Sequence, residues 1–510
     1  MGKAKRNWRA GWLVAVGIVV TFMSLPVNTV SAVTLPKVTT ATLKTYIDSL
    51  TLKQKIGQLF IVRASADSAQ TRVDAQTYAL GGIILFGRDF TGETRASMTK
   101  KIGLMQSGTK VPRFVATDQE GGTVSRLSAS AAIKGNLSLP SPQQSLANGG
   151  TKQLVADTKQ SAALLKQLGI NWNFAPIADV TKDNSSFIYD RTMGKNYKQT
   201  AALMKRLIPA MQANGVAATL KHFPGYGAAV DTHTTFTTVD RTLKQLETED
   251  MVPFKAGIDA GADAVMVTHI VMTALDKKNP ASLSPRVVQY LRQQMGFNGV
   301  IITDDLAMDA VQHFATQQGI QSVDVAAVEA GMDAIIADDY QTGIPAIEAA
   351  VRSGKISERQ IDASILRLLK LKQRLGLITP EVVNVPHVTV QKPVIKNNKI
   401  ILHGRVCARE AQAGQRVVAG NQGKQVTARI NAAGKFTLTF AGMTRQQQVT
   451  VKVADKNVPA KTVTLPSVVK KTSGQHETTH TLTYVLIGAV AAVLGIVGII
   501  WWRQSQRRRF

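Results

Sequence analysis

The stretch Val216-Ala217-Ala218-Thr219-Leu220-Lys221-His222-Phe223-Pro224-Gly225 joins a short apolar run to a cluster of polar side chains. Its apolar half predicts a buried strand. Pro224 and the glycines that follow it argue against a helix or a central strand in the polar half. Lys221 and His222 are therefore expected on a loop just past the carboxyl end of a strand. In parallel α/β folds, catalytic groups collect at such positions.

Strand and helix patterns alternate in this way from residue 33 to residue 380. Eight short apolar runs are candidate strands: Gln58–Val62, Gly82–Phe86, Arg113–Thr117, Asn171–Phe174, Ala217–Leu220, Ala264–Val267, Val300–Thr303 and Ala334–Ala337. Amphipathic segments between them are candidate helices, for example Gln153–Leu168, Thr200–Asn214 and Arg286–Met295. Eight strand–helix units in this length are the count of a (β/α)₈ barrel, the TIM-like α/β fold. A doubly wound open sheet alternates in the same way, so the count alone leaves both folds open.

The composition is that of a large globular protein. With 510 residues, 44% of them hydrophobic and 19% charged, the chain has room for two or three domains. Its one cysteine, Cys407, excludes an intramolecular disulfide. A net charge of +27 is compatible with nucleic acid as a partner, but the two ends of the chain argue against it.

The N-terminal segment 1–32 has the pattern of a secretory signal peptide. Basic residues precede the apolar run Gly11–Met23, and Val30-Ser31-Ala32 offers small residues for cleavage. An uncleaved anchor helix is the alternative, and the shortness of the apolar run disfavours it.

The segment 482–502 has the pattern of a single transmembrane helix. It carries no charge and has the length needed to cross a bilayer, about 20 residues. Tyr484, Trp501 and Trp502 stand at its edges, and the basic tail 503–510 predicts a cytoplasmic end. A buried core helix is the alternative, which the lack of a polar face disfavours. The main body is therefore expected outside the cell, anchored in the cell membrane, with lipid headgroups and anionic cell-wall polymers nearby and no nucleic acid.

The region 385–468 predicts a second domain. Three segments alternate apolar and polar residues between Gly and Asn turns: Lys399–Val406, Lys435–Phe440 and Gln448–Val453. This pattern is typical of a small all-β sandwich of immunoglobulin-like type. From residue 385 to residue 480 there are fifteen Lys/Arg and three Asp/Glu, so the domain is strongly basic. The polar residues 469–481 are expected to form a flexible stalk.

Two further motifs place polar groups after predicted strands. Thr117-Asp118-Gln119-Glu120-Gly121-Gly122, followed by Arg126, suits close contact with a polar ligand, although an ordinary βα turn uses the same residue types. In Gly299-Val300-Ile301-Ile302-Thr303-Asp304-Asp305 an apolar strand ends on two carboxylates. A carboxylate there acts as a nucleophile, a general base or a metal ligand, and Asp305 is also suited to cap a following helix.

The chain lacks the usual cofactor motifs. His222, His233 and His269 do not show the H-x-x-x-H or H-E-x-x-H spacings of zinc sites. A phosphate-binding loop and a G-x-S-x-G elbow are also absent from the sequence. We therefore expect no metal and no cofactor, and His269 is expected to be a hydrogen-bonded structural histidine.

Taken together, the motifs occur in the order seen in glycoside hydrolase family 3. The remaining members of the set are Asn173-Phe174-Ala175-Pro176, Asp231-Thr232-His233 and Leu306-Ala307-Met308. From Leu43 to Leu377 the sequence resembles the β-N-acetylglucosaminidase (β-N-acetylhexosaminidase) branch of that family. The resemblance implies that residues 33–380 form a catalytic barrel that acts through a covalent glycosyl-enzyme.

The same resemblance implies the role of each site residue. Asp304 is expected to be the nucleophile, His233 the general acid/base and Asp231 its orienting partner. A histidine suits this role because it titrates near neutral pH, and a carboxylate on its other nitrogen fixes the tautomer. The residues implied in substrate binding are Asp118, Arg126, Arg191, Lys221, His222 and Met308.

The loop after Gly225 departs from the pattern of the branch. Tyr226 replaces a second histidine, Ala228 replaces an aspartate, and the loop is one residue shorter. Asp231 and His233 are retained, so we expect an active exo-enzyme that removes terminal β-linked N-acetylglucosamine, from peptidoglycan fragments in particular. A glucosidase or xylosidase of the same family is the nearest alternative. The second alternative is a catalytically inert wall-binding surface protein, which the retention of Asp304, Asp231 and His233 together disfavours.

Overall fold

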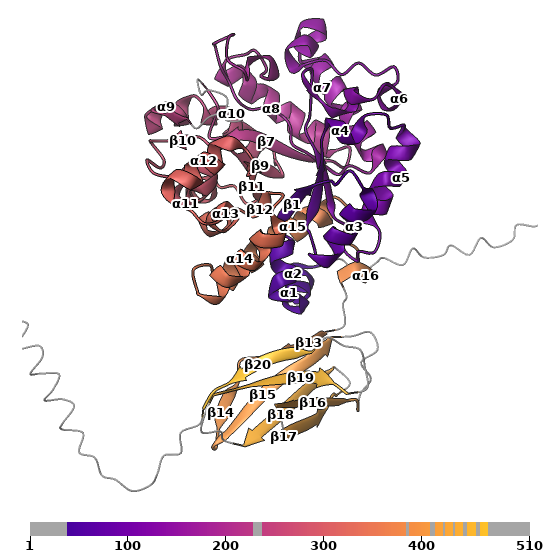
Figure 1. Ribbon diagram of the computed structural model, residues 1–510, viewed down its shortest axis with the longest axis vertical. Helices are drawn as coiled ribbons and strands as arrows, with labels where there is room; N and C mark the ends of the chain where they lie inside the picture. The colour runs from indigo at the N-terminus through magenta and orange to yellow at the C-terminus, as the bar shows by residue number, and fades with distance from the viewer. Residues whose placement is uncertain are drawn as a thin grey trace, which may run out of the picture. The chain divides into compact units, whose positions relative to one another are not determined.

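The computed structural model describes residues 38–227, 237–383, 387–407, 414–421, 424–431, 434–441, 446–454 and 460–467. Two folded regions lie in this part of the chain. The first is an α/β barrel, and the second is an all-β region (Figure 1). Each is described by itself.

Eight parallel strands form a closed barrel. In chain order they are β1 (Phe60–Arg63), β2 (Gly82–Leu85), β3 (Phe114–Thr117), β6 (Trp172–Asn173), β7 (Ala217–Phe223), β9 (Ala264–Val267), β11 (Val300–Asp305) and β12 (Ala334–Ile336). Each pairs with the next, and β12 closes the ring on β1 through Ile335 and Phe60. All eight predicted strands are present, and the closure rules out the open doubly wound sheet.

The strands are apolar because the barrel buries both of their faces. Every residue of β2, β3 and β9 is buried. Inward side chains fill the barrel centre and outward ones meet the surrounding helices, so no polar alternation is needed. The longer helices around the barrel are α1 (Thr40–Ser49), α3 (Ser68–Thr77), α5 (Arg95–Gln106), α7 (Pro142–Leu168), α8 (Tyr197–Gln212), α10 (Met251–Asp259), α12 (Asp309–Gln318), α13 (Val323–Ala330), α14 (Tyr340–Arg352) and α15 (Glu358–Arg374).

Short elements complete the barrel region. The short helices are α2 (Leu52–Gly57), α4 (Gly87–Phe90), α6 (Ala131–Lys134), α9 (Leu243–Thr248), α11 (Pro285–Gln289) and α16 (Pro380–Val383). Two small sheets lie outside the barrel, made by β4 (Gln119–Gly121) with β5 (Val124–Ser125) and by β8 (Thr238–Val239) with β10 (Val271–Met272). The predicted helix Arg286–Met295 is divided, because α11 gives way to a π-helical turn from Tyr290 to Gln294.

Two strands run further than the sequence predicted. β7 includes Lys221 and His222, which were expected on a loop, because Ala178 N–H donates to the Lys221 carbonyl at 2.8 Å. Pro224, which has no N–H, comes directly after the strand. β11 likewise includes Asp304 and Asp305. The prediction of Asp305 as a helix cap was wrong, since α12 begins four residues later with Met308 at its N-cap.

The all-β region consists of two four-stranded antiparallel sheets. One contains β13 (His387–Val390), β14 (Val394–Lys396), β15 (Lys399–Cys407) and β18 (Lys435–Ala441). The other contains β16 (Arg416–Asn421), β17 (Lys424–Arg429), β19 (Gln447–Val453) and β20 (Lys461–Leu465). Alternate residues of both sheets, such as Leu402, Phe436 and Val451, form one hydrophobic core. The three segments that the sequence predicted as strands correspond to β15, β18 and β19. The immunoglobulin-like topology stays a prediction.

The predicted terminal segments fall outside the described residues. This holds for the signal peptide 1–32, the stalk 469–481, the transmembrane helix 482–502 and the tail 503–510. Among the helices that the structure does describe, none has both the length and the apolar character needed to span a bilayer.

Candidate active site

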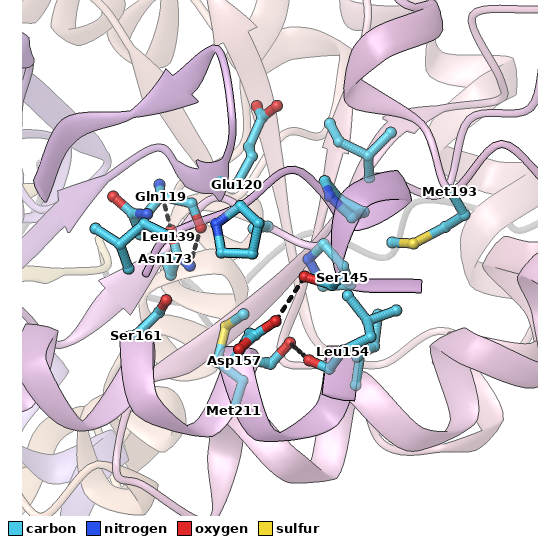
Figure 2. A pocket seen from close by; sticks show the side chains of 18 residues that line it. Gln119, Glu120, Leu139, Ser145, Leu154, Asp157, Ser161, Asn173, Met193 and Met211 are labelled. Atoms are coloured by element: carbon cyan, nitrogen blue, oxygen red, sulfur yellow. Dashed lines mark hydrogen bonds between the residues drawn. The ribbon is translucent and has the colours of Figure 1, made fainter. Parts of the chain in front are cut away.

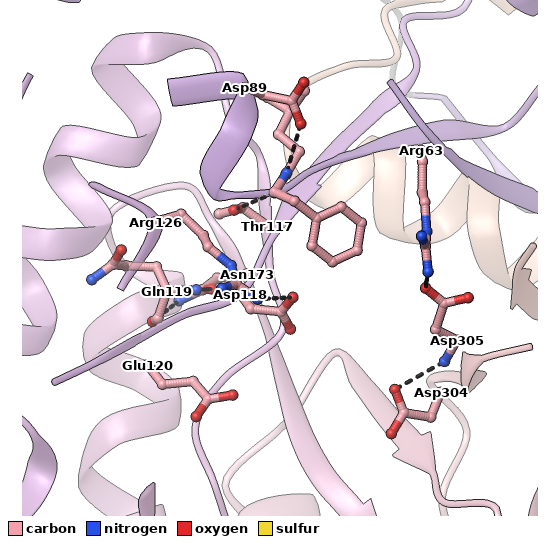
Figure 3. Close-up of polar contacts among 12 residues, drawn as sticks. Arg63, Asp89, Thr117, Asp118, Gln119, Glu120, Arg126, Asn173, Asp304 and Asp305 are labelled. Atoms are coloured by element: carbon pink, nitrogen blue, oxygen red, sulfur yellow. Dashed lines mark hydrogen bonds and ion pairs between the residues drawn. The ribbon is translucent and has the colours of Figure 1, made fainter. Parts of the chain in front are cut away.

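A buried ion network lies at the carboxyl ends of β3 and β7. Lys221 Nζ is 2.8 Å from Asp118 Oδ1 and 2.7 Å from Glu120 Oε1. The Glu120 carboxylate also accepts two hydrogen bonds from the guanidinium of Arg191, at 2.9 and 2.8 Å. Arg126 Nη2 lies 3.4 Å from Asp118 Oδ2. Three of the predicted sugar-binding side chains, Arg126, Lys221 and Arg191, are thus joined through two carboxylates. Figure 3 shows the contact between Arg126 and Asp118.

The network decides the charge state of its members. Burial raises the pKa of Glu120, but the nearby cations Lys221 and Arg191 outweigh burial and bring that pKa down to about 2. Burial lowers the pKa of Lys221, and the carboxylates of Asp118 and Glu120 more than reverse the effect, so the pKa is raised. Glu120 and Lys221 are therefore ionised at neutral pH, and each compensates the burial of the other.

His222 is held by a residue that the sequence did not single out, Asp179. Asp179 Oδ2 accepts from the His222 backbone N–H at 2.9 Å and lies 2.7 Å from His222 Nδ1. The other oxygen of Asp179 accepts from the Tyr226 backbone N–H at 2.7 Å. His222 Nε2 lies 3.5 Å from Arg191 Nη2. Because an arginine can only donate, Nε2 is the acceptor, and the proton of a neutral imidazole is on Nδ1.

Asp304, the predicted nucleophile, is the residue before the last in β11. Its Oδ1 accepts the backbone N–H of Asp305 at 2.9 Å. Burial raises the pKa of Asp304, but electrostatic interactions with His222, His269 and Lys221 and the backbone hydrogen bond outweigh burial and lower the pKa below its usual value. Figure 3 shows the carboxylates of Asp304 and Asp118 directed toward the same space from opposite strands. Asp304 is therefore an ionised carboxylate that faces the ion network.

The neighbouring Asp305 has a different task. Its carboxylate forms an ion pair with Arg63, the last residue of β1, and accepts the Ala307 N–H at 2.9 Å (Figure 3). Arg63 in turn pairs with Asp338, at 3.1 Å between Nε and Oδ2. These contacts tie the turn after Asp304 to the ends of β1 and β12. Arg63 was missed by the sequence reasoning, although its place at the end of a strand was a signal.

The structure also shows the surroundings of Met308, His269 and Asn173, which the sequence analysis named. Met308 is buried at the N-cap of α12, four residues beyond Asp304. His269 is fully buried, with Nδ1 2.7 Å from Ser282 Oγ and Nε2 2.9 Å from the Asp305 carbonyl, which confirms the expectation of a hydrogen-bonded structural histidine. Asn173 exchanges two hydrogen bonds with the backbone of Gln119, at 2.8 and 2.9 Å, and so fixes the start of β4.

The predicted acid/base pair is not visible in this arrangement. Asp231 and His233 lie in residues 228–236, which are outside the described part of the chain. Their roles stay predictions. Tyr226, at the start of that loop, is buried and packs edge-on against Phe187, with the ring centroids 4.9 Å apart. The described side of the loop is therefore anchored through Asp179 and Phe187.

A pocket of about 550 Å³ lies beside Glu120 (Figure 2). It is lined in part by α7, which bends at Gly149 and Gly150. Ser145 Oγ donates to Asp157 Oδ2 at 2.7 Å and so joins the two halves of the bent helix across the pocket. In this pocket the side chains of Ser145 and Asp157 bond to each other, whereas the carboxylates of Asp118 and Asp304 are directed toward the same space (Figure 3). The second arrangement is the stronger candidate for chemistry.

Comparisons with known proteins agree with this geometry. The Glycosyl hydrolase family 3 N terminal domain matches residues 51–371. A Beta-hexosaminidase of Xanthomonas campestris pv. campestris (strain B100) is 36% identical over 250 residues, which are 48% of this chain and 73% of that protein. A Beta-hexosaminidase of Stenotrophomonas maltophilia (strain R551-3) is 36% identical over 277 residues, 53% of this chain and 79% of that protein.

Solved structures of β-N-acetylglucosaminidases and β-N-acetylhexosaminidases are also similar to this chain. A glycoside hydrolase family 3 beta-N-acetylglucosaminidase from Paenibacillus sp. str. FPU-7 superposes with a TM-score of 0.59 and 32% identity, over 68% of this chain and 70% of that one. A Beta-N-acetylhexosaminidase from Beutenbergia cavernae DSM 12333 superposes with a TM-score of 0.54 and 29% identity, over 64% of this chain and 99% of that one. The chain therefore belongs to glycosyl hydrolase family 3, in the β-N-acetylhexosaminidase branch that its motifs predicted.

Proposed function

We propose that the barrel is a retaining exo-β-N-acetylglucosaminidase that hydrolyses terminal β-linked N-acetylglucosamine. The names of its relatives support this class of substrate. The observation that carries the proposal is the setting of Asp304: a carboxylate of lowered pKa at the end of β11, beside the cations of the ion network. A nucleophile must be ionised at the working pH, and this setting keeps Asp304 ionised.

The proposed reaction has two steps. In the first, a carboxylate oxygen of Asp304 attacks the anomeric carbon while the glycosidic bond breaks, and His233 gives a proton to the departing oxygen. In the second, His233 takes a proton from water, the water oxygen attacks the same carbon, and the bond to Asp304 breaks. Two displacements at one carbon retain its configuration. Asp231 keeps the imidazole of His233 in the required tautomer.

The ion network is suited to bind the sugar. Asp118 accepts hydrogen bonds, Arg126 and Lys221 donate them, and the side chains already hold one another in place. Such preorganised groups recognise hydroxyls with little loss of side-chain entropy. Glu120 lies behind this layer, fully paired to Lys221 and Arg191, and so positions the two cations.

We further propose that the enzyme works outside the cell, anchored by residues 482–502, on fragments of peptidoglycan. The sequence patterns of both chain ends support this location. The described part of the all-β region carries lysine and arginine side chains and no aspartate or glutamate. A groove of about 1280 Å³ on it is lined by Arg405, Arg429 and Lys435, which suits an anionic polymer.

The decisive test is the Asp304→Ala variant on a chromogenic N-acetylglucosaminide. We expect turnover to be abolished, because no glycosyl-enzyme can form. Asp309→Ala, which removes an exposed carboxylate five residues further on, serves as the matched control and should keep near-wild-type activity. A fluorinated glycosyl donor should add the mass of one sugar to the peptide that contains Asp304. Normal turnover by a folded Asp304→Ala enzyme, or a label on another residue, would refute the assignment.

A further inference from the structure

A second pocket lies between α12, α13 and α14, and the proposed sugar-binding side chains do not line it. It encloses about 840 Å³, including space that is open to solvent. Leu306 and Ala307, which directly follow the Asp304–Asp305 pair, form part of its wall. The polar side chains that line it are Asp324, Asp338, Asp339, Gln312, Gln321, Thr316, Ser322 and Thr342.

Asp324 is the residue that points to a ligand. It is only 4% exposed, yet it makes no hydrogen bond or ion pair with any residue between 38 and 467 that the structure describes. Helix capping does not account for it, because Ser322 already caps α13 by accepting from the Val325 N–H at 3.3 Å. The carboxylate lines the pocket without a protein partner, and a side chain so little exposed is only partly hydrated, so an oppositely charged ligand in the pocket would stabilise it.

The backbone of α14 makes room for this carboxylate. A Cβ atom on Gly343 would lie 2.1 Å from Asp324 Oδ2, so any other residue would displace the carboxylate. Gly343 lies inside a helix, where glycine is less favourable than alanine. The helix therefore gives up stability at the position that lets Asp324 reach the pocket.

The pocket has an excess of negative charge. Burial and the neighbouring charge of Asp339 together raise the pKa of Asp324 to about 7. Asp338 differs from the other two aspartates because Arg63 already pairs with it. A cation placed between Asp324 and Asp339 would therefore relieve both the burial of one carboxylate and the repulsion between the two.

An organic cation fits better than a metal ion. Across the described residues, no group of three or more His, Cys, Asp or Glu is arranged to hold a metal. The pocket is also much larger than one ion, and Leu306, Ile320 and Val323 give it an apolar wall. We propose that this pocket binds the primary ammonium group of an organic ligand. Asp324 pairs with the ammonium, Asp339 adds a second negative charge, and the apolar wall receives the carbon chain. The inference does not depend on the proposed glycosidase activity.

Calorimetric titration of the purified protein with pentylammonium chloride at pH 8 tests the proposal, with pentanol as the neutral probe. We expect pentylammonium to bind and pentanol to fail. Asp324→Asn keeps the shape of the side chain and should weaken binding roughly 10- to 100-fold, the value of a hydrogen bond to a charged group. Asp259→Asn, at an exposed position on α10 outside the pocket, is the matched control and should bind like the wild type.

A second variant keeps the carboxylate but moves it. Gly343→Ala should also weaken binding of pentylammonium, because the new methyl group occupies the place of Asp324 Oδ2. Equal binding by the wild type and Asp324→Asn would overturn the proposal, and so would equal binding of pentylammonium and pentanol. Asp324-dependent binding of Mg²⁺ or Ca²⁺ without binding of pentylammonium would also overturn it, by assigning the pocket to a metal.

Discussion

Replacing Glu120 by glutamine tests the buried ion network most directly. The change keeps the size of the side chain and removes its charge. Lys221, 2.7 Å away, then keeps only Asp118 as a counter-charge, and Arg191 loses its one carboxylate partner among the described residues. A pKa of about 2, against about 4.3 for a free glutamate, corresponds to about 3 kcal/mol in favour of the ionised form. Breaking a buried pair costs about 3–5 kcal/mol by general experience. We expect Glu120→Gln to destabilise the barrel by about 3 kcal/mol.

Urea unfolding followed by tryptophan fluorescence measures this loss. Of the five tryptophans in the chain, Trp172 is the one between residues 38 and 467, and it is fully buried in β6, so the change in emission that accompanies unfolding of the barrel is assigned to it. Glu348→Gln is the matched control, because its partner Arg352 is exposed on the surface of α14 and surface pairs of this kind contribute less than about 1 kcal/mol. A loss in Glu120→Gln no larger than that of Glu348→Gln would refute the reasoning.

The difference in unfolding free energy between the wild type and Glu120→Gln should also depend on pH, in a direction that the pKa of Glu120 determines. The pKa of Glu120 is lowered in the folded state. The ionised carboxylate therefore contributes its full stabilisation above the unfolded pKa, about 4.3, and this stabilisation is lost as pH falls toward about 2. The difference between wild type and Glu120→Gln should therefore be constant from pH 6 to pH 8 and shrink below about pH 4.3. A difference that stays the same down to pH 2.5 would contradict an electrostatic origin.

Three further predictions follow from the site, the pocket and the basic region. His233→Ala should slow hydrolysis of substrates with poor leaving groups by about 10²–10⁴-fold and of activated aryl glycosides far less, since acid assistance matters most for a basic leaving oxygen. Equal losses of rate on both substrate classes in steady-state assays would indicate a structural role for His233. Asp324→Asn should stabilise the barrel at pH 8 by up to about 4 kcal/mol in urea unfolding. The raised pKa of Asp324 makes the wild type lose stability as pH rises from about 4 to about 7, and asparagine does not ionise. A variant no more stable than the wild type at pH 8 would contradict this. Of two truncations, ending near Pro380 and near Lys471, only the longer should sediment with purified cell walls, less so at high salt; equal sedimentation would remove the wall-binding proposal, and an inactive shorter form would show that the all-β region helps to build the site.

The sequence by itself determined the barrel strands, the order of the motifs and the family. This was feasible because a strand buried on both faces must be apolar over several residues, and such runs are visible without knowledge of the fold. The position of Asp304 after the run Val300–Thr303 was visible for the same reason. Closure of the ring, through the pairing of β12 with β1, was decided only by the tertiary structure, because an open sheet has the same local pattern.

The partners of the charged side chains were also decided only in three dimensions. Glu120 contacts Arg191 and Lys221, which follow it by 71 and 101 residues in the sequence, and no spacing rule relates these positions. Asp179 lies in an unremarkable segment and becomes the anchor of His222. Lys221 belongs to a strand because buried carboxylates compensate its charge, which the apolar-run criterion takes no account of. Periodicity reports which residues are buried, whereas compensation of buried charge depends on contacts between distant strand ends, and only the folded chain brings those ends together.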